Sequence, residues 1–446
     1  MSNRTAWIIF TRVPEPGKTK TRLMPYYSSK ECAELHEAFL KDIREAIRIE
    51  ANSDIDIFVA YNGDFSKLKP IFGEEVRYFT QEGQSLGERM QNAFEFVFEQ
   101  GYKRVVLIGT DVPHVAGQGL TRATRVLDSA DFVIGPTVDG GYWLIGMNQL
   151  VDGVFSMEKY GHDNVLQQTL GELPFGVIAE FLPETFDIDY PDDLRRYFDG
   201  IIEDSFTRRY IVENRKISVI IPTYNESKII LNFLKELEKF QDRAEIIFAD
   251  GGSTDGTREL IKENIKGKPQ YKLIYTTKGR AAQMNAGAKE SNGDILLFLH
   301  SDIILPANPV DEILHEILSC EWGCFGIKFR SKNFFMLTNR IISNFRAKRR
   351  RIIFGDQGMF IERNVFFRLG QFPILPIMED FQFSLDARKV LGKTRLTKSR
   401  LLVSDRRYRG NTITKLKMMK QMHDLRKMYI NGRDVSEISD IYRDIR

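Results

Sequence analysis

The stretch KISVIIPTYNES, residues 216–227, has the pattern that usually begins an α/β domain, although it lies halfway along the chain. Four β-branched residues, at 217 and 219–221, end at Pro222, and Asn225 with Glu226 then begins a helical pattern. A short apolar run closed by a proline is typical of a buried strand. The sequence therefore predicts that an independent domain starts near residue 216.

The length and composition of the chain favour two globular domains. Its 446 residues exceed what one hydrophobic core usually supports. With 42% hydrophobic and 28% charged residues, the composition is that of an ordinary globular protein. The formal net charge of +3 is too small for a surface that coats nucleic acid, so we expect no nucleic-acid partner.

Cysteine content and apolar runs indicate the compartment. Cys32, Cys320 and Cys324 are the three cysteines, a sparse set that fits a reduced compartment better than a disulfide framework. The first apolar run, residues 7–10, is too short for a signal peptide and reads as a strand. The stretch ILLFLHSDIIL is interrupted well before the roughly twenty residues that span a bilayer. We expect a cytoplasmic protein without a transmembrane helix.

Both halves of the chain alternate short apolar runs with amphipathic segments, which predicts strands and crossover helices around mostly parallel sheets. In the first half the expected strands are 6–10, 54–61, 104–109 and 131–136, with helices at 29–50, 86–99 and 120–129. In the second half they are 217–222, 245–250, 272–277 and 294–302, with helices at 227–240, 257–264 and 281–291. A charged segment near 205–214 is the expected linker between domains 1–205 and 214–446. The alternative, one long sheet, would be unusually wide.

Acidic residues follow the predicted strands of the second half. In parallel α/β sheets ligands gather at the carboxyl ends of strands, which places Glu226, Asp250 and Asp302 along one rim. Asp302 could hold Mg²⁺ or Mn²⁺ that also bridges a diphosphate, because hard cations prefer oxygen ligands. The alternatives are a turn with a helix cap at 250–255 and a solvated aspartate at the end of a strand.

Five segments together resemble glycosyltransferase family 2, the inverting enzymes of the GT-A fold that use nucleotide sugars. They are VIIPTYNE, FADGGSTDGT, KGRAAQMNAGAKESNGDILLFLHSD, GDQGMF and MEDFQFSLDARKVLG. The resemblance covers about residues 217–410. Within the family, the chain looks most similar to glycosyltransferases of arsenosugar biosynthesis that are found beside radical-SAM proteins.

The resemblance implies a UDP-sugar site. The residues implied to hold the uridine part are Pro222, Thr223, Tyr224, Glu226 and Asp250. Arg280 is implied to approach the diphosphate, Asp302 to bind the metal, and Gln357 of GDQGMF to belong to the site. The usual Asp-x-Asp metal motif appears here as His300-Ser301-Asp302, so its first acid is missing and Asp302 alone would have to serve.

The segment MED begins a predicted amphipathic helix with Glu379 and Asp380 at its N-terminus. In the family this pair carries the general base, and we expect Asp380 to be that base. A base within hydrogen-bond reach of the acceptor hydroxyl removes its proton as the oxygen attacks the anomeric carbon. The alternative is two acids that only favour the helix dipole.

Two basic segments are further candidates for anion binding. Residues 346–351 form a dense basic run, which is usually a solvated face but could meet an anionic acceptor, a diphosphate or a membrane surface. Apolar neighbours Phe345, Ile352 and Ile353 make peripheral membrane contact conceivable. By family resemblance only, Arg406 and Arg407 are placed to bind phosphate.

In the first half, a loop after the first strand carries Lys18, Lys20 and Arg22 between proline and glycine residues. Clustered cationic donors of this kind neutralise a diphosphate or triphosphate, whereas the alternative is a basic surface loop. Asp111 ends a clean apolar strand, as Asp302 does. Farther on, the turn of Asp139, Gly140 and Gly141 would let backbone approach a ligand, and Asp187 with Asp189 offers another metal carboxylate.

Over about residues 7–195 this half resembles the GT-A-like transferases grouped with 2-phospholactate guanylyltransferase. The segment KTRL marks their phosphate loop, and DYPDDL is similar to the metal-binding DTPEDL segment of CMP-Kdo synthetases. The resemblance implies Lys20 and Arg22 on phosphates and Asp111 and Asp189 on Mg²⁺. It leaves open whether the reaction is nucleotidyl or glycosyl transfer.

Together the two resemblances imply an α/β chain of two tandem GT-A, Rossmann-like domains and a metal-dependent bifunctional transferase. The second domain would be an inverting glycosyltransferase that uses a UDP-sugar, and the first a nucleotidyltransferase that supplies or uses an activated sugar. Two successive glycosyltransferases, or a first domain that only docks, are the alternatives. The expected partners are a nucleotide sugar, an NTP and a small-molecule or lipid-linked acceptor, with peripheral contact at the inner face of the membrane as the alternative to a purely cytoplasmic location.

Overall fold

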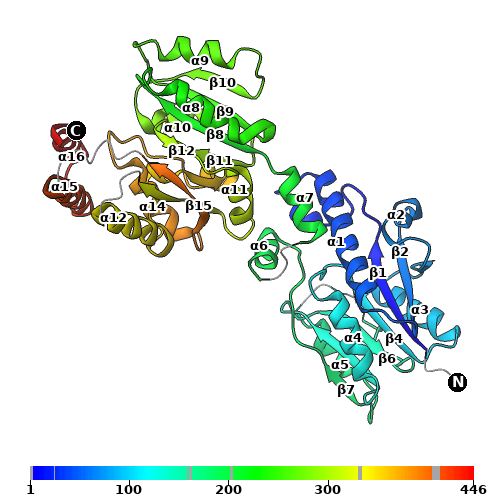
Figure 1. Ribbon diagram of the computed structural model, residues 1–446. Coiled ribbons are helices and arrows are strands. Elements are labelled where there is room, and N and C mark those ends of the chain that lie inside the picture. The colour runs from blue at the N-terminus through cyan, green and yellow to red at the C-terminus, as the bar shows by residue number, and fades with distance from the viewer. Residues whose placement is uncertain are drawn as a thin grey trace. The chain divides into compact units, whose positions relative to one another are not determined.

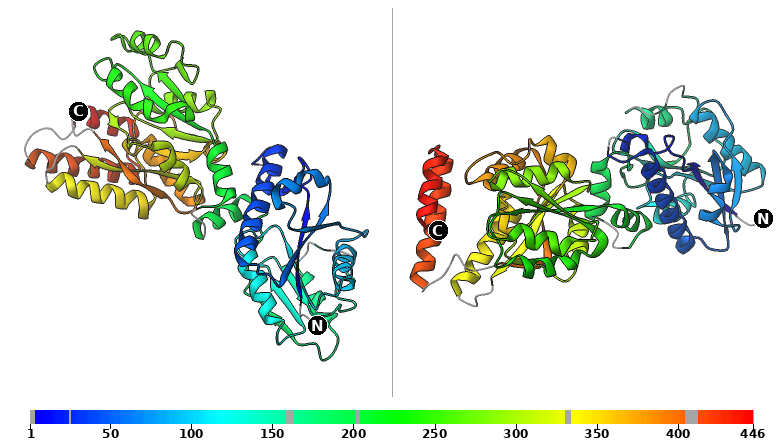
Figure 2. Two further views of the ribbon diagram at one scale, coloured as in Figure 1. Left: turned by 45° about the vertical axis from the view of Figure 1, so that its right-hand side comes forward. Right: turned by 90° about the horizontal axis from the view of Figure 1, so that it is seen from above.

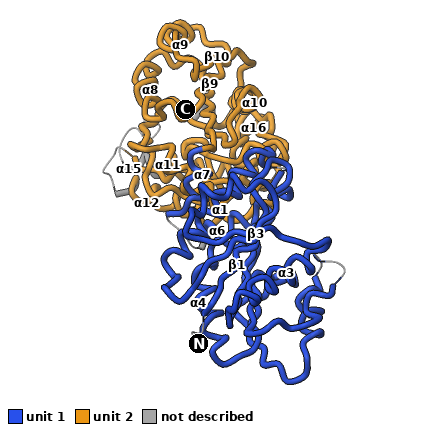
Figure 3. The backbone as a smooth tube through the Cα atoms, turned by 90° about the vertical axis from the view of Figure 1, so that its right-hand side faces the viewer, with its two compact units in different colours: residues 1–213 blue, residues 214–446 orange. Residues whose placement is uncertain are grey.

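The computed structural model divides the chain into two compact units, residues 1–213 and 214–446 (Figure 3). The structure describes residues 4–24, 26–157, 160, 163–200, 204–329, 334–403 and 412–445. Each unit is built around its own sheet with helices on both faces (Figure 1).

The sheet of the first unit has seven strands in the order β3-β2-β1-β4-β6-β5-β7. Its pairs are parallel except those that β6 makes with β4 and β5. The strands are β1 Thr5–Arg12, β2 Ile55–Asn62, β3 Arg77–Thr80, β4 Arg104–Gly109, β5 Phe132–Pro136, β6 Tyr142–Met147 and β7 Ala179–Phe181.

Successive side chains of β1 serve two cores, because neighbouring residues of a strand point to opposite faces. Trp7 and Ile9 pack with Leu40 of α1 on one face, and Ile8 packs with Phe94 of α3 on the other. The helices of this unit are α1 Ser29–Glu50, α2 Lys69–Phe72, α3 Leu86–Glu99, α4 Ala116–Val126, α5 Val165–Gly171, α6 Pro191–Gly200 and α7 Phe206–Asn214.

The segment predicted as a linker, 205–214, contains helix α7. The buried carboxylate of Asp42 in α1 accepts hydrogen bonds from the backbone N–H of Phe206 at 2.7 Å and of Thr207 at 3.1 Å, and from the Thr207 hydroxyl at 2.6 Å. Tyr210 donates to Glu34 at 2.9 Å. These bonds satisfy the free N–H groups at the start of α7 and attach it to α1.

The sheet of the second unit has eight strands in the order β10-β9-β8-β11-β14-β13-β15-β12. The run from β10 to β11 is parallel, and β14 is antiparallel to both of its neighbours. The strands are β8 Ile217–Thr223, β9 Ala244–Asp250, β10 Tyr271–Tyr275, β11 Ile295–Phe298, β12 Ile303–Ile304, β13 Trp322–Phe329, β14 Met359–Glu362 and β15 Arg395–Val403.

The helices that follow the last strand close one side of the second unit (Figure 2). Leu425 and Ile438 pack against Met378 and Phe381 at the start of α14. The helices are α8 Ile230–Leu237, α9 Thr257–Ile265, α10 Arg280–Glu290, α11 Pro309–Ile317, α12 Phe334–Phe345, α13 Arg363–Arg368, α14 Glu379–Val390, α15 Thr412–Ile430 and α16 Val435–Ile445. Within the described ranges, none of the helices combines the length and apolarity needed to cross a bilayer.

The predicted fold class, two α/β units with mostly parallel sheets, is confirmed. The helices predicted at 29–50 and 86–99 have the predicted bounds. The helix expected at 120–129 begins earlier, because α4 spans Ala116–Val126. The strands that were not anticipated are β3, β6, β7, β12, β13, β14 and β15.

Candidate functional site

Asp250 organises the loop at the carboxyl end of β9. Its fully buried carboxylate accepts hydrogen bonds from the backbone N–H of Gly252 and Ser253, both at 3.0 Å, and from Arg258 Nε at 2.5 Å. Burial alone would raise the pKa of Asp250, but the hydrogen bonds from Ser253 and Arg258 outweigh it and keep the pKa below its ordinary value. The carboxylate is therefore charged, and it shapes the loop that was predicted to bind a nucleotide.

The end of β8 is fixed to the same loop by a residue that the sequence did not single out. Gln283 of α10 donates from Nε2 to the carbonyl oxygens of Thr223 at 2.7 Å and Ala249 at 2.8 Å. Thr223 is fully buried, whereas Tyr224 is exposed and has Lys278 Nζ 4.2 Å from its ring centroid. The backbone N–H of Glu226 donates to Thr257 Oγ1 at 2.8 Å. The segments predicted to hold uridine are thus joined by hydrogen bonds.

Arg280 and Glu379, the first residues of α10 and α14, form an ion pair. Arg280 Nη1 lies 3.1 Å from Glu379 Oε1. The Glu379 side chain is buried and that of Arg280 about a third exposed, at 3% and 35%. The ion pair joins Arg280, which was predicted to approach the diphosphate, to Glu379, one of the two residues predicted to carry the general base.

Asp380 lies beside that pair in an environment that favours its protonated form. Its Oδ2 accepts a hydrogen bond from the backbone N–H of Gly355 at 2.8 Å. Burial, and then the negative charge of Glu379, raise the pKa of Asp380 to about 6, although Arg280 opposes the shift. A carboxylate with a raised pKa accepts a proton more readily than an ordinary aspartate.

His300 packs against the same backbone. A Cβ atom added to Gly355 would lie 2.6 Å from His300 Nε2 and 3.5 Å from Asp380 Oδ2. The histidine that replaces the first acid of the metal motif therefore lies on the Asp380 side of the site.

Asp302 follows β11 and is half-buried. Across the described segments of the chain, no three His, Cys, Asp or Glu side chains are grouped so as to hold a metal ion. A divalent ion at Asp302 would need further oxygen ligands from substrate phosphates and water, which is a common arrangement for Mg²⁺.

Gln357 and the basic run lie partly inside the fold. Gln357 is fully buried, and its Oε1 accepts from Arg346 Nη2 at 3.1 Å. Its Nε2 has no hydrogen-bond partner among the described residues. Burial lowers the pKa of Arg346 to about 10, and its guanidinium lies 4.1 Å from the Phe354 ring centroid. Arg351 Nη1 donates to the Leu391 carbonyl oxygen at 2.9 Å.

The prediction of one continuous basic patch at 346–351 is therefore wrong at both ends. Only Lys348, Arg349 and Arg350 of this run are exposed. Ile352 and Ile353, which were expected to accompany the patch, are buried, whereas Phe345 is exposed. The predicted phosphate ligands Arg406 and Arg407 lie outside the described residues.

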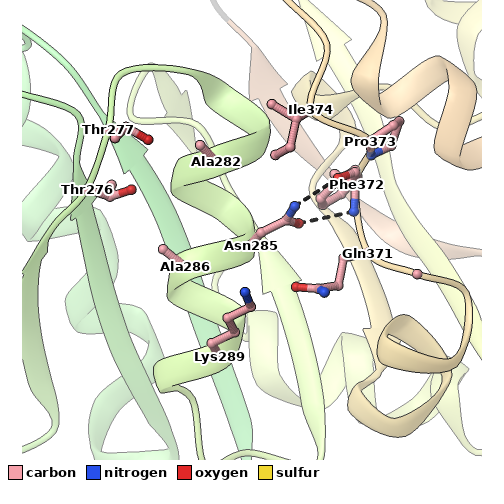
Figure 4. A pocket seen from close by; sticks show the side chains of 11 residues that line it. Thr276, Thr277, Ala282, Asn285, Ala286, Lys289, Gln371, Phe372, Pro373 and Ile374 are labelled. Atoms are coloured by element: carbon pink, nitrogen blue, oxygen red, sulfur yellow. Dashed lines mark hydrogen bonds between the residues drawn. The ribbon is translucent and has the colours of Figure 1, made fainter.

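A pocket of about 500 Å³ opens on the other side of α10 (Figure 4). Asn285 spans it by donating to the Phe372 carbonyl oxygen at 2.8 Å and accepting from the Phe372 N–H at 3.1 Å. None of the predicted site residues lines it. The lining residues are Thr276, Thr277, Ala282, Asn285, Ala286, Lys289, Gly370, Gln371, Phe372, Pro373 and Ile374.

In the first unit, Lys20 lies among the predicted metal ligands. Its Nζ is 2.6 Å from Asp111 Oδ1, 3.8 Å from Asp189 Oδ1 and donates to the Ile188 carbonyl oxygen at 2.7 Å. Arg22 Nη1 is 2.5 Å from Asp189 Oδ2. The structure thus brings together Lys20, Arg22, Asp111 and Asp189. Lys18 instead pairs with Glu15 at 2.6 Å and is exposed.

Further carboxylates surround this cation. Burial, and then the charges of Asp111, Asp139 and Asp189, raise the pKa of Asp187 to about 7. Burial would also raise the pKa of Asp111, but Lys20 outweighs it and lowers that pKa. The first unit therefore has an acidic site in which a lysine ammonium balances part of the charge.

The turn that carries Asp139 depends on glycine. Asp139 Oδ1 accepts from Thr137 Oγ1 at 2.5 Å and from the Gly141 N–H at 3.2 Å. Gly140 has φ 85°, and a Cβ atom there would lie 2.0 Å from the Asp163 carbonyl oxygen. Only glycine fits this position without a rearrangement.

His36 is a neighbour of this site that the sequence analysis did not single out. It is buried in α1, and its Nε2 lies 3.3 Å from Thr110 Oγ1, next to Asp111. Burial lowers the pKa of His36 to about 4, so the imidazole is neutral near pH 7. A lone histidine within a helical pattern offered no signal for this position.

Two family models match the chain, each over part of one unit. Residues 218–371 match the model described as glycosyl transferase family 2. This match lies within the second unit. Residues 45–162 match the model described as an uncharacterised protein conserved in bacteria, DUF2064.

Curated relatives match short parts of the chain. An uncharacterised glycosyltransferase of Haemophilus influenzae is 33% identical over 105 residues, 23% of this chain and 42% of the relative. Undecaprenyl-phosphate 4-deoxy-4-formamido-L-arabinose transferase of Proteus mirabilis is 28% identical over 125 residues, 26% of this chain and 37% of the relative. The chain thus spans less than half the length of these relatives.

Two solved structures are similar to parts of this chain, with low TM-scores. A "putative nucleotide-diphospho-sugar transferase" from Desulfovibrio desulfuricans G20 is 31% identical, with 48% of this chain and 96% of that chain covered and a TM-score of 0.44. A mannosyltransferase from Pyrobaculum calidifontis, solved in complex with GDP-Man and Mn²⁺, is 21% identical over 49% of this chain and 65% of that chain, with a TM-score of 0.38.

Proposed function

We propose that the second unit is an inverting glycosyltransferase that uses a nucleotide-diphosphate sugar, with a UDP-sugar as the first candidate donor. In this proposal the loop of Asp250 and the segment 222–226 hold the nucleoside, and Arg280 meets the diphosphate. The match to glycosyl transferase family 2 over residues 218–371 supports the assignment.

The observation that carries the proposal is the arrangement of Arg280, Glu379 and Asp380. Glu379 is buried and ion-paired with Arg280, so its charge is already engaged. Asp380 has a raised pKa of about 6 and lies at the same helix start. The arrangement favours Glu379 as the residue that positions Arg280 and Asp380 as the general base.

The reaction follows from these roles. The acceptor hydroxyl oxygen attacks the anomeric carbon, Asp380 takes the hydroxyl proton, and the bond from that carbon to the diphosphate oxygen breaks with inversion. Arg280 stabilises the negative charge on the departing nucleoside diphosphate. Mg²⁺ or Mn²⁺ at Asp302, when bound, would supply further charge stabilisation to the same leaving group.

The acceptor is either a small molecule or a lipid-linked group. The Proteus mirabilis relative is named for transfer to undecaprenyl phosphate, which supports the second alternative. The narrower resemblance to enzymes of arsenosugar biosynthesis supports the first alternative, a small-molecule acceptor.

For the first unit we propose a nucleotidyltransferase-like site at Lys20, Arg22, Asp111 and Asp189. A bound Mg²⁺–phosphate group would replace the ion pairs among these side chains. Phosphate oxygens can bind the two cations, and the metal can bind the two carboxylates. A second glycosyltransferase and a docking module remain the alternatives.

The test uses the full-length chain with Mn²⁺ and a panel of UDP-, GDP- and CMP-sugars. We expect the chain to release nucleoside diphosphate. This release should be lost in D380N and retained in D111N, which disables the first unit. If D380N hydrolyses and transfers at the wild-type rate, the assignment of the base is wrong. Pyrophosphate release from NTP and a sugar phosphate, lost in D111N, would identify the first unit as a nucleotidyltransferase.

A further inference from the structure

Helix α12 is held to the sheet of the second unit by one face only. Asn344 Oδ1 accepts from the backbone N–H of Ile327 at 2.9 Å, and Asn344 Nδ2 donates to the Ile327 carbonyl oxygen at 3.2 Å. Met336 and Ser343 are buried on the same side. These contacts with β13 fix the rotation of the helix about its axis.

The part of α12 turned away from buried Met336 and Ser343 presents large apolar side chains to solvent. Leu337, Ile341 and Phe345 are 40%, 57% and 55% exposed, and Ile342 is 57% exposed. Residues four apart lie on one side of a helix, so these side chains form a stripe. Scattered exposed apolar residues are ordinary, whereas a contiguous stripe marks an interaction surface.

A cluster of cations continues from the end of the stripe. Lys348, Arg349 and Arg350 are exposed, and the part-buried side chains of Arg346 and Arg351 are hydrogen-bonded within the fold at both ends of the turn. The sequence from 334 to 351 contains no acidic residue. Helix α15 packs beside α12 and carries exposed Lys417 and Lys420 (Figures 1 and 2).

We propose that the face formed by Leu337, Ile341, Ile342, Phe345 and Lys348–Arg350 docks on an anionic lipid bilayer. Apolar side chains of an interfacial helix enter the boundary between headgroups and acyl chains, and neighbouring cations bind anionic headgroups. This docking does not depend on the proposed reaction. It would hold the second unit at a membrane surface without a spanning helix.

The charge of the surface selects this occupant over a second copy of the chain. Two copies that met through this face with parallel α12 helices would bring their Lys348–Arg350 clusters together, and in an antiparallel contact the clusters would find no acid in the segment 334–351 of the other copy. An anionic bilayer complements both the apolar stripe and the cations. Its attraction weakens as salt screens the charges.

Vesicle flotation of the full-length chain tests the inference. We expect binding to phosphatidylcholine vesicles that contain phosphatidylglycerol, weak binding to phosphatidylcholine alone, and release at high salt. Replacing Lys348, Arg349 and Arg350 by Gln should lower the partition coefficient on the order of a hundredfold, since each cation near an anionic surface contributes about fivefold. The pair I341S/I342S should reduce binding with no change in charge.

The matched control replaces Lys262, Lys266 and Lys268, which are exposed on another segment of the same unit, by Gln. This variant should bind anionic vesicles as the wild type does, and circular dichroism should show that all variants fold. Binding that is equal in the two charge variants, or absent for the wild type, overturns the inference. Dimers in solution that I341S/I342S abolishes would assign the face to a second copy instead. Transfer to a soluble acceptor is measured in parallel and should remain unchanged, which separates this test from that of the proposed function.

Discussion

Arg280 and Glu379 are 99 positions apart in the sequence, yet each is the first residue of its helix and their side chains meet at 3.1 Å. The contact brings the starts of α10 and α14 to one point. The residue after Glu379 is Asp380, so the ion pair also sets where the proposed base stands.

Replacing Asp380 tests the role of that base. D380N keeps the size of the side chain but cannot accept a proton, so we expect turnover to fall roughly a hundredfold to ten-thousandfold with little change in donor affinity. Turnover and the donor KM are measured with the same nucleotide sugar. E379Q is the contrasting variant, and it should weaken donor binding because Arg280 loses its charged partner.

The pH dependence of turnover should show the titration of Asp380. The base works only as a carboxylate, and its pKa is raised to about 6, so kcat/KM should rise as the pH increases through about 6 and level off above 7. A buffer series from pH 4.5 to 8 checks this. A profile that is flat across this range would contradict the assignment.

Lys20 should stabilise the first unit more than Arg22 does. K20M leaves the carboxylates of Asp111 and Asp189 without their buried cation, and we expect a loss of about 1–3 kcal/mol in the free energy of unfolding. The Arg22 side chain is half exposed, so R22M should cost about 0–1 kcal/mol. Denaturant unfolding of both variants gives the comparison, and equal losses would mean that the Lys20 site is not a tight internal pair.

Gly140 and Gly176 provide a matched pair of glycines with positive φ, 85° and 94°. G176A meets no atom within 4 Å, so it should cost about 1–2 kcal/mol from the backbone conformation alone. G140A adds a clash with the Asp163 carbonyl oxygen and should cost clearly more. Thermal unfolding measures both, and similar melting temperatures would show that the turn rearranges freely.

The sequence predicted the parallel strands β1, β2 and β4 of the first sheet and β8 to β11 of the second, because buried parallel strands read as uninterrupted apolar runs. It did not predict where α4 begins, since the segment AGQG at 116–119 has weak helix propensity. The structure explains these glycines by close packing. A Cβ at Gly117 would lie 2.8 Å from the Ala46 carbonyl oxygen, and one at Gly119 would lie 2.3 Å from the Trp143 ring.

The candidate residues were found more readily than their partners. Acids at the ends of predicted strands indicated Asp250 and Asp111, and the resemblance of DYPDDL indicated Asp189, but nothing local indicates that Gln283 joins two strand ends. The basic run at 346–351 was misjudged for a similar reason. Charge alone does not tell which arginine is buried, and the fold engages Arg346 and Arg351 internally.

Helix α10 contacts four segments of the second unit. Gln283 hydrogen-bonds to the ends of β8 and β9, Arg280 reaches the start of α14, and Asn285 clasps the backbone of Phe372, six residues before Met378. A nucleotide that displaces this helix would move the proposed base with it. In the proposed reaction the donor would then bind first, and the acceptor side of the site would form afterwards. One rigid helix would impose this order.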